Sequence, residues 1–315
     1  MKKIILISLI AFLYAVPCLS QNNKNFVPLF NGKDLTNWTL EKPGGFEVVD
    51  GELITRSFGK GNDIYTNKWY GNYTLRLEFM LSEVGNSGVF IRCKPSAPGD
   101  GFEVQLLAPW TPWRDDLHCT GSMYGYVAVT NRPDETTGIW YKMEIKCDRN
   151  IITISINDKV TTLANTDTVT TMVKTLFYGV IGLQGNHATK KDQYAKFRNI
   201  YIRDFDAEPD YVLKGFYEKN DQLRNLAHNA AVNLGAEMLQ PLSDMMLGDN
   251  PVAKNGAKQT LFDIVAKASN PTASKEEKKE VTSALKKCIK DTSSPITKNY
   301  LKWLSGMINK DNSKS

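Results

Sequence analysis

A carboxylate and an amide lie two residues apart in the segment GFEVQLLAP, at Glu103 and Gln105. Alternation along a strand would place Phe102, Val104 and Leu106 on one face and these two polar residues on the other. The polar pair is either a solvated part of an outer sheet face or part of a groove. In a groove, the carboxylate could act as a base while the amide holds a sugar hydroxyl.

A neighbouring segment, GVFIRCK, adds an arginine to the same prediction. Its alternation points Val89, Ile91 and Cys93 to the core and leaves Arg92 on the opposite face. If both strands belong to one sheet, Arg92 would lie near Glu103, fix the orientation of its carboxylate and favour its charged form. An ordinary surface ion pair is the alternative.

Aromatic and imidazole side chains gather in the loop LAPWTPWRDDLHCTGSMYG, which contains Trp110, Trp113, His118 and Tyr124. Exposed rings on such a loop stack well on sugar faces, and the histidine and the tyrosine can exchange protons. The tryptophans could equally cap the core of the fold. His187 ends a further strand-like segment, IGLQGNH, where a lone histidine is either structural or catalytic.

Several common kinds of active site are disfavoured by the sequence. A retaining glycosidase needs two carboxyl groups about 5 Å apart, whereas Glu103 is followed by Gln105 and then Pro109 where sandwich glucanases carry Glu-x-Asp-x-x-Glu. There is no Gly-x-Ser-x-Gly elbow, phosphate loop or HExxH motif. The net charge of +5 is spread along 315 residues without a dense basic run, so nucleic acid is not an expected partner.

Short alternating segments separated by Gly, Asn, Asp and Pro extend from about residue 26 to 206. In YTLRLEFML, for example, Tyr73, Leu75 and Leu77 share one face while Thr74 and Arg76 share the other, as in a half-buried antiparallel strand. Many such strands without a helical period predict a two-sheet sandwich over residues 21–207.

A small helical bundle is predicted for residues 208–315. Helical apolar spacing covers residues 221–239 and 256–268. The capping box Ser274-Lys-Glu-Glu277 and the pair Ser294-Pro295 predict the starts of two later helices. This segment could serve as an oligomerisation or docking module.

The first residues, MKKIILISLIAFLYAVPCLSQ, resemble a bacterial export signal that is cleaved after Ser20. The expected location is therefore the periplasm or cell envelope. Lipid attachment at Cys18 is the alternative, although Val16-Pro17 departs from the small residues that lipoproteins carry there. The apolar segment is shorter than the ~20 residues of a membrane span, and no other segment is long enough.

Four cysteines remain after the predicted cleavage, and their wide spacing contains no CxxC pair. Cys93 and Cys147 occupy inward positions of predicted strands, which favours buried thiols. An oxidising compartment would also permit a bridge from Cys119 to either of them.

Taken in order, the segments FVPLFNGKDLTNW, NDIYTNKWYGNYTLRLEF, NSGVFIRC, GFEVQL, TGSMYG, GIW, IGLQ and FRNIYIRDF resemble those of the 3-keto-disaccharide hydrolase domain family. The resemblance covers about residues 26–206. It implies a concanavalin-A-like jelly-roll sandwich that cleaves glycosides oxidised at carbon 3 in a groove on the concave face of a sheet.

The resemblance also implies site residues. The family's Asn-Ser-Gly corresponds to Asn86, Ser87 and Gly88. Its arginine corresponds to Arg92, its Glu-x-Gln to Glu103 and Gln105, its tyrosine to Tyr124 and its histidine to His187. The chain departs from the family pattern at Ala108-Pro109, which replaces a usual aspartate, and at Trp140-Tyr141, which replaces Trp-Asn. His187 also lies three residues after Gln184 rather than two.

These residues suggest an elimination mechanism. A ketone at carbon 3 acidifies the hydrogen on carbon 2, so one base can remove it while the aglycone leaves carbon 1, and water can then add. We hypothesise that Glu103 is the base, that Arg92 or a divalent cation stabilises the enolate, and that Tyr124 or His187 is the acid. The expected substrate-binding side chains are Gln105, Asn86, Ser87, Trp110, Trp113 and His118. The sequence shows no cluster with metal-ligand spacing.

A carbohydrate-binding module without catalytic activity is the alternative function, because this sandwich hosts both lectins and enzymes. Such a module would use Trp110, Trp113 and the same sheet face. It would not need a carboxylate with a perturbed pKa.

Overall fold

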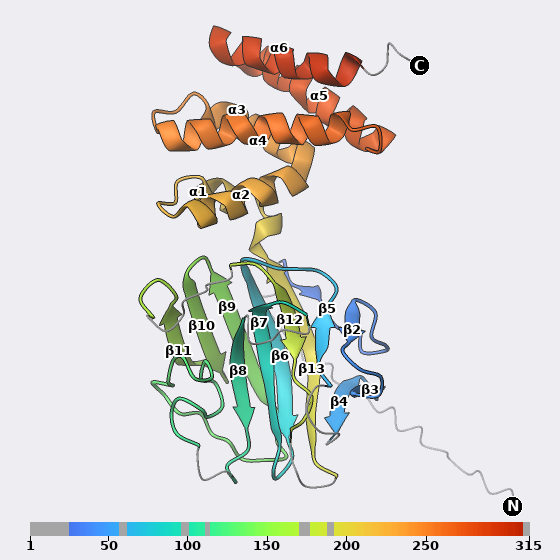
Figure 1. The fold of residues 1–315 in the computed structure, drawn as a ribbon, viewed down its shortest axis with the longest axis vertical. Coiled ribbons are helices and arrows are strands. Elements are labelled where there is room, and N and C mark those ends of the chain that lie inside the picture. The colour runs from blue at the N-terminus through green and yellow to red at the C-terminus, as the bar shows by residue number, and fades with distance from the viewer. Residues whose placement is uncertain are drawn as a thin grey trace, which may run out of the picture.

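The computed structural model describes residues 25–56, 62–95, 101–110, 114–169, 177–187 and 192–310. The predicted signal peptide, residues 1–20, and the predicted sugar-stacking Trp113 lie outside these ranges. Within them, two antiparallel sheets form a sandwich, and the helices stack on one end of it (Figure 1). The predicted fold class, a jelly-roll sandwich followed by an all-α region, is confirmed.

The larger sheet has the strand order β11-β10-β9-β6-β13-β4-β3, with β1 paired to β13. The smaller sheet has the order β2-β5-β12-β7-β8. The strands of the larger sheet are β1 (Val27–Pro28), β3 (Phe46–Val49), β4 (Glu52–Arg56), β6 (Tyr73–Leu81), β9 (Tyr141–Asp148), β10 (Ile151–Ile156), β11 (Lys159–Asn165) and β13 (Tyr194–Asp204). Those of the smaller sheet are β2 (Trp38–Leu40), β5 (Ile64–Thr66), β7 (Asn86–Cys93), β8 (Phe102–Leu107) and β12 (Val180–Leu183).

The sandwich core lies between the two sheets and follows from the alternation of the strands. In β6, the residues Tyr73, Leu75 and Leu77 are buried in this core, as the sequence predicts. The smaller sheet contributes Val89 and Ile91 of β7 from the other side. Residues that alternate with these core positions therefore lie on the outer faces of the two sheets.

A β-bulge in β7 interrupts this alternation. Gly182 of β12 pairs with Phe90, but Val180 pairs with Cys93, so Ile91 and Arg92 together oppose a single residue of β12. Arg92 adopts a φ of +50° at this point. The extra residue reverses the faces of the last two positions, because each residue added to a strand turns the following side chains over.

The bulge corrects two predictions. The fully buried Arg92 donates from Nε and Nη2 to the carbonyl oxygen of Gly71, at 3.1 Å and 3.0 Å, so it does not share the face of Glu103. Cys93 is buried not in the core between the sheets but in a separate cluster with Tyr65, Phe90 and Val180. The four described cysteines, Cys93, Cys119, Cys147 and Cys288, are all free thiols.

The helices are connected to the sandwich without a long linker, because β13 continues through the 3-10 turn η2 (Phe205–Ala207) into α1 (Pro209–Gly215). The other helical elements are α2 (Asp221–Leu234), η3 (Gly235–Met238), α3 (Leu239–Met245), α4 (Pro251–Ser269), α5 (Lys275–Asp291) and α6 (Pro295–Lys310). Among the helices that the structure describes, none combines the length and apolar character that a membrane span requires.

Helix ends follow the capping residues of the sequence. Ser274 accepts a hydrogen bond from the Glu277 amide at 3.0 Å and begins α5, and Ser294 caps α6 through the Thr297 amide at 3.2 Å. Helix α2 ends at Leu234 rather than at residue 239, because Gly235 has a φ of +66°.

Polar contacts attach the helices to the sandwich. Asp206 accepts hydrogen bonds from the backbone and side-chain nitrogens of Asn72, both at 2.9 Å. The Tyr211 hydroxyl donates to Asp148 at 2.7 Å, and a 2.8 Å ion pair joins Arg149 to Glu218. These contacts hold α1 and the segment after it against the end of the larger sheet.

Candidate functional site

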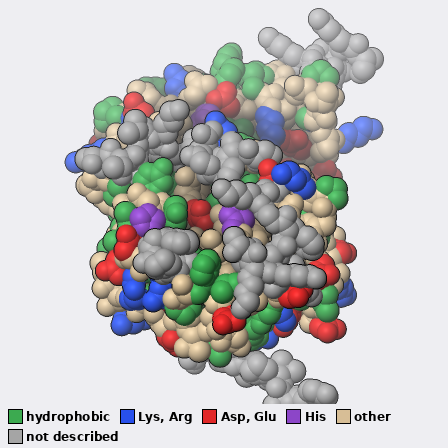
Figure 2. Space-filling model, turned by 60° about the horizontal axis from the view of Figure 1, so that its bottom comes forward, with side chains coloured by type: hydrophobic (Ala, Val, Ile, Leu, Met, Phe, Trp, Pro, Cys, Tyr) green, Lys and Arg blue, Asp and Glu red, His purple; other side chains and the backbone are tan. Residues whose placement is uncertain are grey.

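The outer face of the five-stranded sheet carries polar residues from neighbouring strands. Val104 and Leu106 point to the sandwich core, so Glu103 and Gln105 of β8 lie on the outer face, as predicted. The same alternation places a second set of residues on this face: Asp63 and Tyr65 next to or in β5, Asn86, Gly88 and Phe90 in β7, and Gly182 and Gln184 in or after β12. We call this set, together with Glu103 and Gln105, the outer-face site. Figure 2 turns the end of the sandwich away from the helices forward and shows histidine side chains on both sides of a small acidic area.

Glu103 is held by amides rather than by a cation. Its Oε1 accepts a hydrogen bond from Gln184 Nε2 at 2.9 Å. The Gln105 amide is best oriented with its nitrogen toward Glu103, where it donates to Oε1 at 3.1 Å and to the Ser87 carbonyl at 3.2 Å. Two amide donors on one carboxylate oxygen leave the other oxygen available to accept a proton.

The pKa of Glu103 is raised to about 7. Burial is the main cause, since it disfavours the charged carboxylate, and the negative charge of Asp63 adds to the shift. The hydrogen bond from Gln184 acts in the opposite direction and lowers the pKa. A carboxyl group with a pKa near 7 can accept and release protons at neutral pH, which is the requirement for a general base.

Gly88 provides the space that the Glu103 carboxylate occupies. A Cβ atom on Gly88 would lie 2.2 Å from Glu103 Oε1 and 2.8 Å from its Cγ, closer than non-bonded atoms approach. Glycine in the Asn-Ser-Gly segment therefore lets the carboxylate lie directly over the backbone of β7, and a larger residue there would displace it.

Asn86 and Ser87 face opposite sides of β7. Asn86 lies on the outer face, and its backbone amide donates to Asn186 Oδ1 at 3.0 Å. Ser87 points inward, is fully buried, and donates its hydroxyl to the Gln184 carbonyl at 2.6 Å. The prediction that Ser87 binds substrate directly is thus wrong in its geometry, because this hydroxyl positions the residue that holds Glu103.

Asp63 is a second carboxyl group at this site, which our sequence reasoning missed. It is buried, and it accepts hydrogen bonds from the Gly185 amide at 2.9 Å and from the Tyr65 hydroxyl at 3.2 Å. Burial raises the pKa of Asp63, while these bonds and the nearby charge of His187 oppose that rise. Strand β5 has only three residues, so its alternation is too short to signal an outward acid.

His187 lies beside the first residue of β7. Its backbone amide donates to the Asn86 carbonyl at 2.7 Å, and its charge acts on Asp63. The structure therefore brings the predicted His187 to the edge of the outer-face site, next to the carboxyl group that the sequence did not reveal.

Tyr124 and His118 reach the same sheet from the loop after β8. Met123 bridges Val104 and points to the core, so Tyr124 lies opposite Glu103 and donates its backbone amide to the Glu103 carbonyl at 2.9 Å. The Tyr124 side chain is 41% exposed and packs edge-on against the His118 ring at 4.9 Å. His118 Nδ1 in turn contacts Asp115 Oδ1 at 2.7 Å, which lowers the pKa of Asp115.

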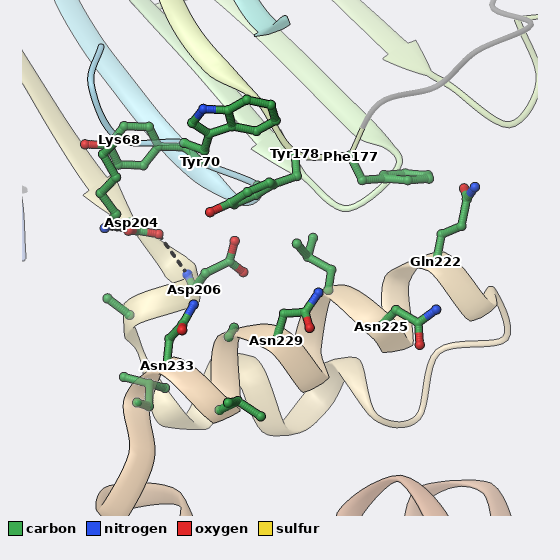
Figure 3. A pocket seen from close by; sticks show the side chains of 17 residues that line it. Lys68, Tyr70, Phe177, Tyr178, Asp204, Asp206, Gln222, Asn225, Asn229 and Asn233 are labelled. Atoms are coloured by element: carbon green, nitrogen blue, oxygen red, sulfur yellow. Dashed lines mark hydrogen bonds and ion pairs between the residues drawn. The ribbon is translucent and has the colours of Figure 1, made fainter. Parts of the chain in front are cut away.

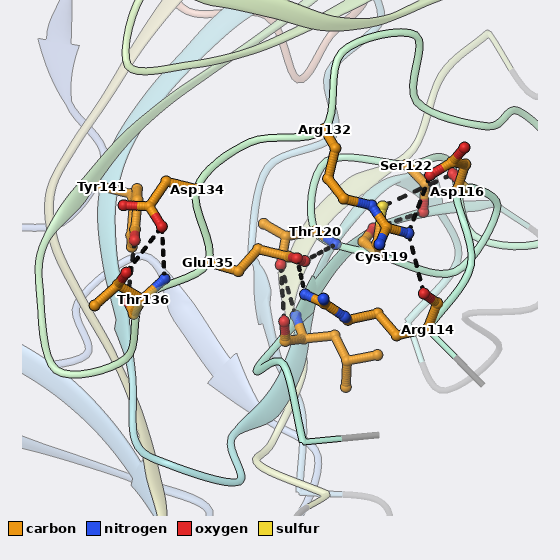
Figure 4. A network of polar contacts seen from close by, with 11 residues as sticks. Arg114, Asp116, Cys119, Thr120, Ser122, Arg132, Asp134, Glu135, Thr136 and Tyr141 are labelled. Atoms are coloured by element: carbon orange, nitrogen blue, oxygen red, sulfur yellow. Dashed lines mark hydrogen bonds and ion pairs between the residues drawn. The ribbon is translucent and has the colours of Figure 1, made fainter. Parts of the chain in front are cut away.

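A polar network holds this loop against β8 (Figure 4). Glu135 pairs with Arg114 and accepts a hydrogen bond from the Thr120 amide at 3.1 Å. Thr120 also bonds Leu107, because its hydroxyl accepts from the Leu107 amide at 2.9 Å. The loop residues that carry the predicted tyrosine and histidine are thereby fixed relative to Glu103.

The remaining predicted residues are not at the centre of the site. Arg92 is buried at the far end of β7, and Trp110 is 39% exposed just after β8. In the part of the chain that the structure describes, no three His, Cys, Asp or Glu side chains come together as a metal site.

Comparison with known proteins places the sandwich in a group of related structures. A crystal structure of a candidate glycosyl hydrolase from Parabacteroides distasonis ATCC 8503 is 21% identical, covers 57% of this chain and 94% of its own, and gives a TM-score of 0.51. A second candidate glycosyl hydrolase from the same organism is 26% identical, with 57% and 98% coverage and a TM-score of 0.49. Comparison with curated proteins gave no match. A family model described as a 3-keto-alpha-glucoside-1,2-lyase-like domain matches residues 25–203.

Proposed function

Because the chain belongs to the family of 3-keto-α-glucoside-1,2-lyase-like domains, we propose that it cleaves glycosides whose sugar carries a ketone at carbon 3. The observation that carries this proposal is the Glu103 carboxyl group, which is half-buried, held by two amides and has a pKa of about 7. A single base of this kind suits proton removal next to a ketone. The predicted export signal would place this activity in the periplasm or cell envelope.

In the first step, Glu103 removes the hydrogen from carbon 2, and the electron pair forms the enolate of the carbon 3 ketone. The enolate then collapses to a double bond between carbons 1 and 2, and the bond from carbon 1 to the aglycone oxygen breaks. Tyr124 or His187 supplies the proton that the leaving oxygen needs. Water can add across the double bond afterwards, which gives overall hydrolysis.

The polar groups around Glu103 suggest how the developing charge is handled. Arg92 does not take the hypothesised role of stabilising the enolate, because its guanidinium binds the Gly71 carbonyl beyond the opposite end of β7. Asn86 and His187, at the start of β7, are the groups best located to interact with the enolate oxygen. Exposed Tyr124 lies opposite Glu103 and is the better located acid for a leaving group.

The direct test compares a glucoside with its 3-keto form, each incubated with the purified protein. We expect aglycone release only from the keto form, with a 2-hydroxyglycal intermediate if elimination precedes hydration. Parallel reactions with a chelator would report whether a divalent cation takes part. Absence of turnover of the keto form under both conditions would favour the alternative, a carbohydrate-binding domain.

That alternative has one specific observation in its favour, the exposed Trp110 shortly after β8. A binding domain needs such rings but no carboxyl group with a raised pKa. Equal binding of the glucoside and its keto form by the wild-type protein, without cleavage, would support it.

A further inference from the structure

A large cavity lies between the end of the sandwich and helix α2, away from the outer-face site. Its volume is about 950 Å³, near the upper end of the ~300–1,000 Å³ usual for ligand sites. The sandwich lines it with residues before β6 and β12 and at the end of β13, and the helical region lines it with one face of α2 (Figure 3).

Aromatic rings form the sandwich side of this cavity. Trp69 and Tyr178 are 37% and 44% exposed, and their ring centroids lie 5.6 Å apart. Phe177 lies beside them and is in turn contacted by the Arg92 guanidinium, 5.6 Å from its ring centroid. Exposed paired rings offer apolar surfaces on which the carbon face of a sugar ring can stack.

Amide side chains form the opposite side. Gln222, Asn225, Asn229 and Asn233 all line the cavity, and their spacing of three or four residues places them on one face of α2. Figure 3 shows Gln222 extending from α2 toward the sandwich, with Asn225, Asn229 and Asn233 along the same helix. The ring pair lies across the cavity from these four side chains. Among the residues that the structure describes, none forms a hydrogen bond with any of the four amide groups, so the amides are available to a ligand.

The charged groups of the cavity already have partners within the protein, an ion pair in one case and an amide in the other. Lys68 binds Asp204 at 2.6 Å, and both carboxylate oxygens of Asp206 accept hydrogen bonds from Asn72. An uncharged ligand with many hydroxyl groups therefore fits better than an anion or a cation. Amides can both donate to and accept from hydroxyl groups, and one turn of α2 advances by ~5.4 Å, about the length of a pyranose ring.

We propose that this cavity is a second saccharide site, which binds a neutral oligosaccharide with its rings on Trp69 and Tyr178 and its hydroxyl groups on the amides of α2. The site is separate from the outer-face site. Gly88, under the Glu103 carboxylate, and Arg92, which binds Gly71 of the cavity wall, are four residues apart on β7, or ~14 Å.

The cavity walls are held in place by contacts described above, chiefly those of Asp206 with Asn72 and of Tyr211 with Asp148. Gly71 allows the sandwich and α2 to approach closely, since a Cβ atom there would lie 2.6 Å from Asp206 and 2.9 Å from Leu226. A preformed site loses less free energy in ordering on binding.

The test is isothermal titration calorimetry of the full chain with unmodified gluco-, manno-, galacto- and xylo-oligosaccharides of four to six units. We expect at least one of them to bind, and Trp69→Ala and Asn229→Ala each to weaken binding about tenfold or more. Matched controls are Trp303→Ala, an exposed tryptophan of α6, and Asn255→Ala, an exposed asparagine of α4. Both controls should bind like the wild type.

Glu103→Gln separates this site from the proposed active site, because it should leave oligosaccharide binding unchanged. Conversely, Asn229→Ala should leave turnover of a small 3-keto-glucoside unchanged. The proposal is wrong if no oligosaccharide of the panel binds, if the Trp69 and Asn229 variants bind like their controls, or if only Glu103→Gln removes binding. Far-ultraviolet circular dichroism and thermal melting of each variant would show that the fold is intact.

Discussion

Carboxyl groups on the outer faces of the two sheets have different kinds of partners. On the eight-stranded sheet, Glu78 binds Arg198 at 2.7 Å, Glu144 binds Arg76 at 2.7 Å, and Glu52 binds Lys196 at 2.9 Å. On the five-stranded sheet, Glu103 has amide donors and the negative Asp63 as its neighbours.

This difference distinguishes a structural carboxylate from one that is kept for proton transfer. A cation close to a carboxylate stabilises its charged form, so such an ion pair serves the fold rather than proton transfer. Burial among amides without a cation raises the pKa of Glu103 to about 7 instead. The cost of burying this carboxyl group is consistent with a functional role rather than a contribution to stability.

The largest effect is expected for Glu103→Gln. The variant keeps the shape of the side chain but cannot remove a proton, so release of aglycone from a 3-keto-glucoside should fall by ~10²–10⁴-fold. Glu144→Gln, which removes a carboxylate from the other outer face, is the matched control and should keep wild-type turnover. Equal activity of the two variants would remove the contrast between the faces.

Gly88→Ala should have the next largest effect. Its Cβ would lie 2.2 Å from Glu103 Oε1, so the carboxylate must move, and a displacement of about 1 Å can cost ~10²-fold in rate. Gly306→Ala is the control, because a Cβ there meets nothing within 4 Å. Steady-state kinetics on the keto-glucoside and the crystal structure of the Gly88 variant would check both points.

The raised pKa of Glu103 also predicts how stability depends on pH. Its folded pKa of about 7 exceeds the ordinary value of 4.5, so the folded protein holds this proton more tightly than the unfolded chain does. That contribution is fully present below pH 4.5 and is lost as the pH rises through 7. The free energy of unfolding of both proteins can be measured with denaturant at pH 5 and pH 8. The difference between Glu103→Gln and the wild type should shift by ~1–3 kcal/mol in favour of the variant from pH 5 to pH 8. A constant difference between the two proteins would contradict the shift.

The smallest effect is expected for Asp63→Asn, which removes one charge and retains an acceptor for the Gly185 amide. The rate at limiting substrate should rise with pH through about 7 in the wild type, since Glu103 must be deprotonated to act as a base. Without the Asp63 charge, the midpoint of this rise in rate with pH should move down by up to about one pH unit. An unchanged midpoint would mean that burial alone raises the pKa of Glu103.

Much of the site was predictable wherever strands are long and regular. Alternation in β8 placed Glu103 and Gln105 together, and the same rule applied to Asn-Ser-Gly-Val would have placed Ser87 inward with Val89. The motif-based assignment of Ser87 to substrate binding overlooked that consequence.

The errors arose where local geometry departs from alternation. The bulge that turns Arg92 inward depends on pairing with β12, about ninety residues further along the chain. The segment GVFIRCK by itself therefore does not predict it. Asp63 lies just before β5, a strand too short to show a period, and its closeness to Glu103 depends on the order β5-β12-β7-β8. The space that Gly88 leaves becomes meaningful only once Glu103 lies across it.

The position of β13 has a consequence for how the chain folds. This strand pairs with β6 on one side and β4 on the other, and it also carries β1, so it closes the larger sheet. Because it ends at Asp204, the sheet cannot close during synthesis until most of the sandwich sequence has emerged, and its pairings span long loops that slow folding. The helices that follow can dock only on a finished end, so α1 and α2 should assemble on the sandwich only after β13 has paired with β6 and β4.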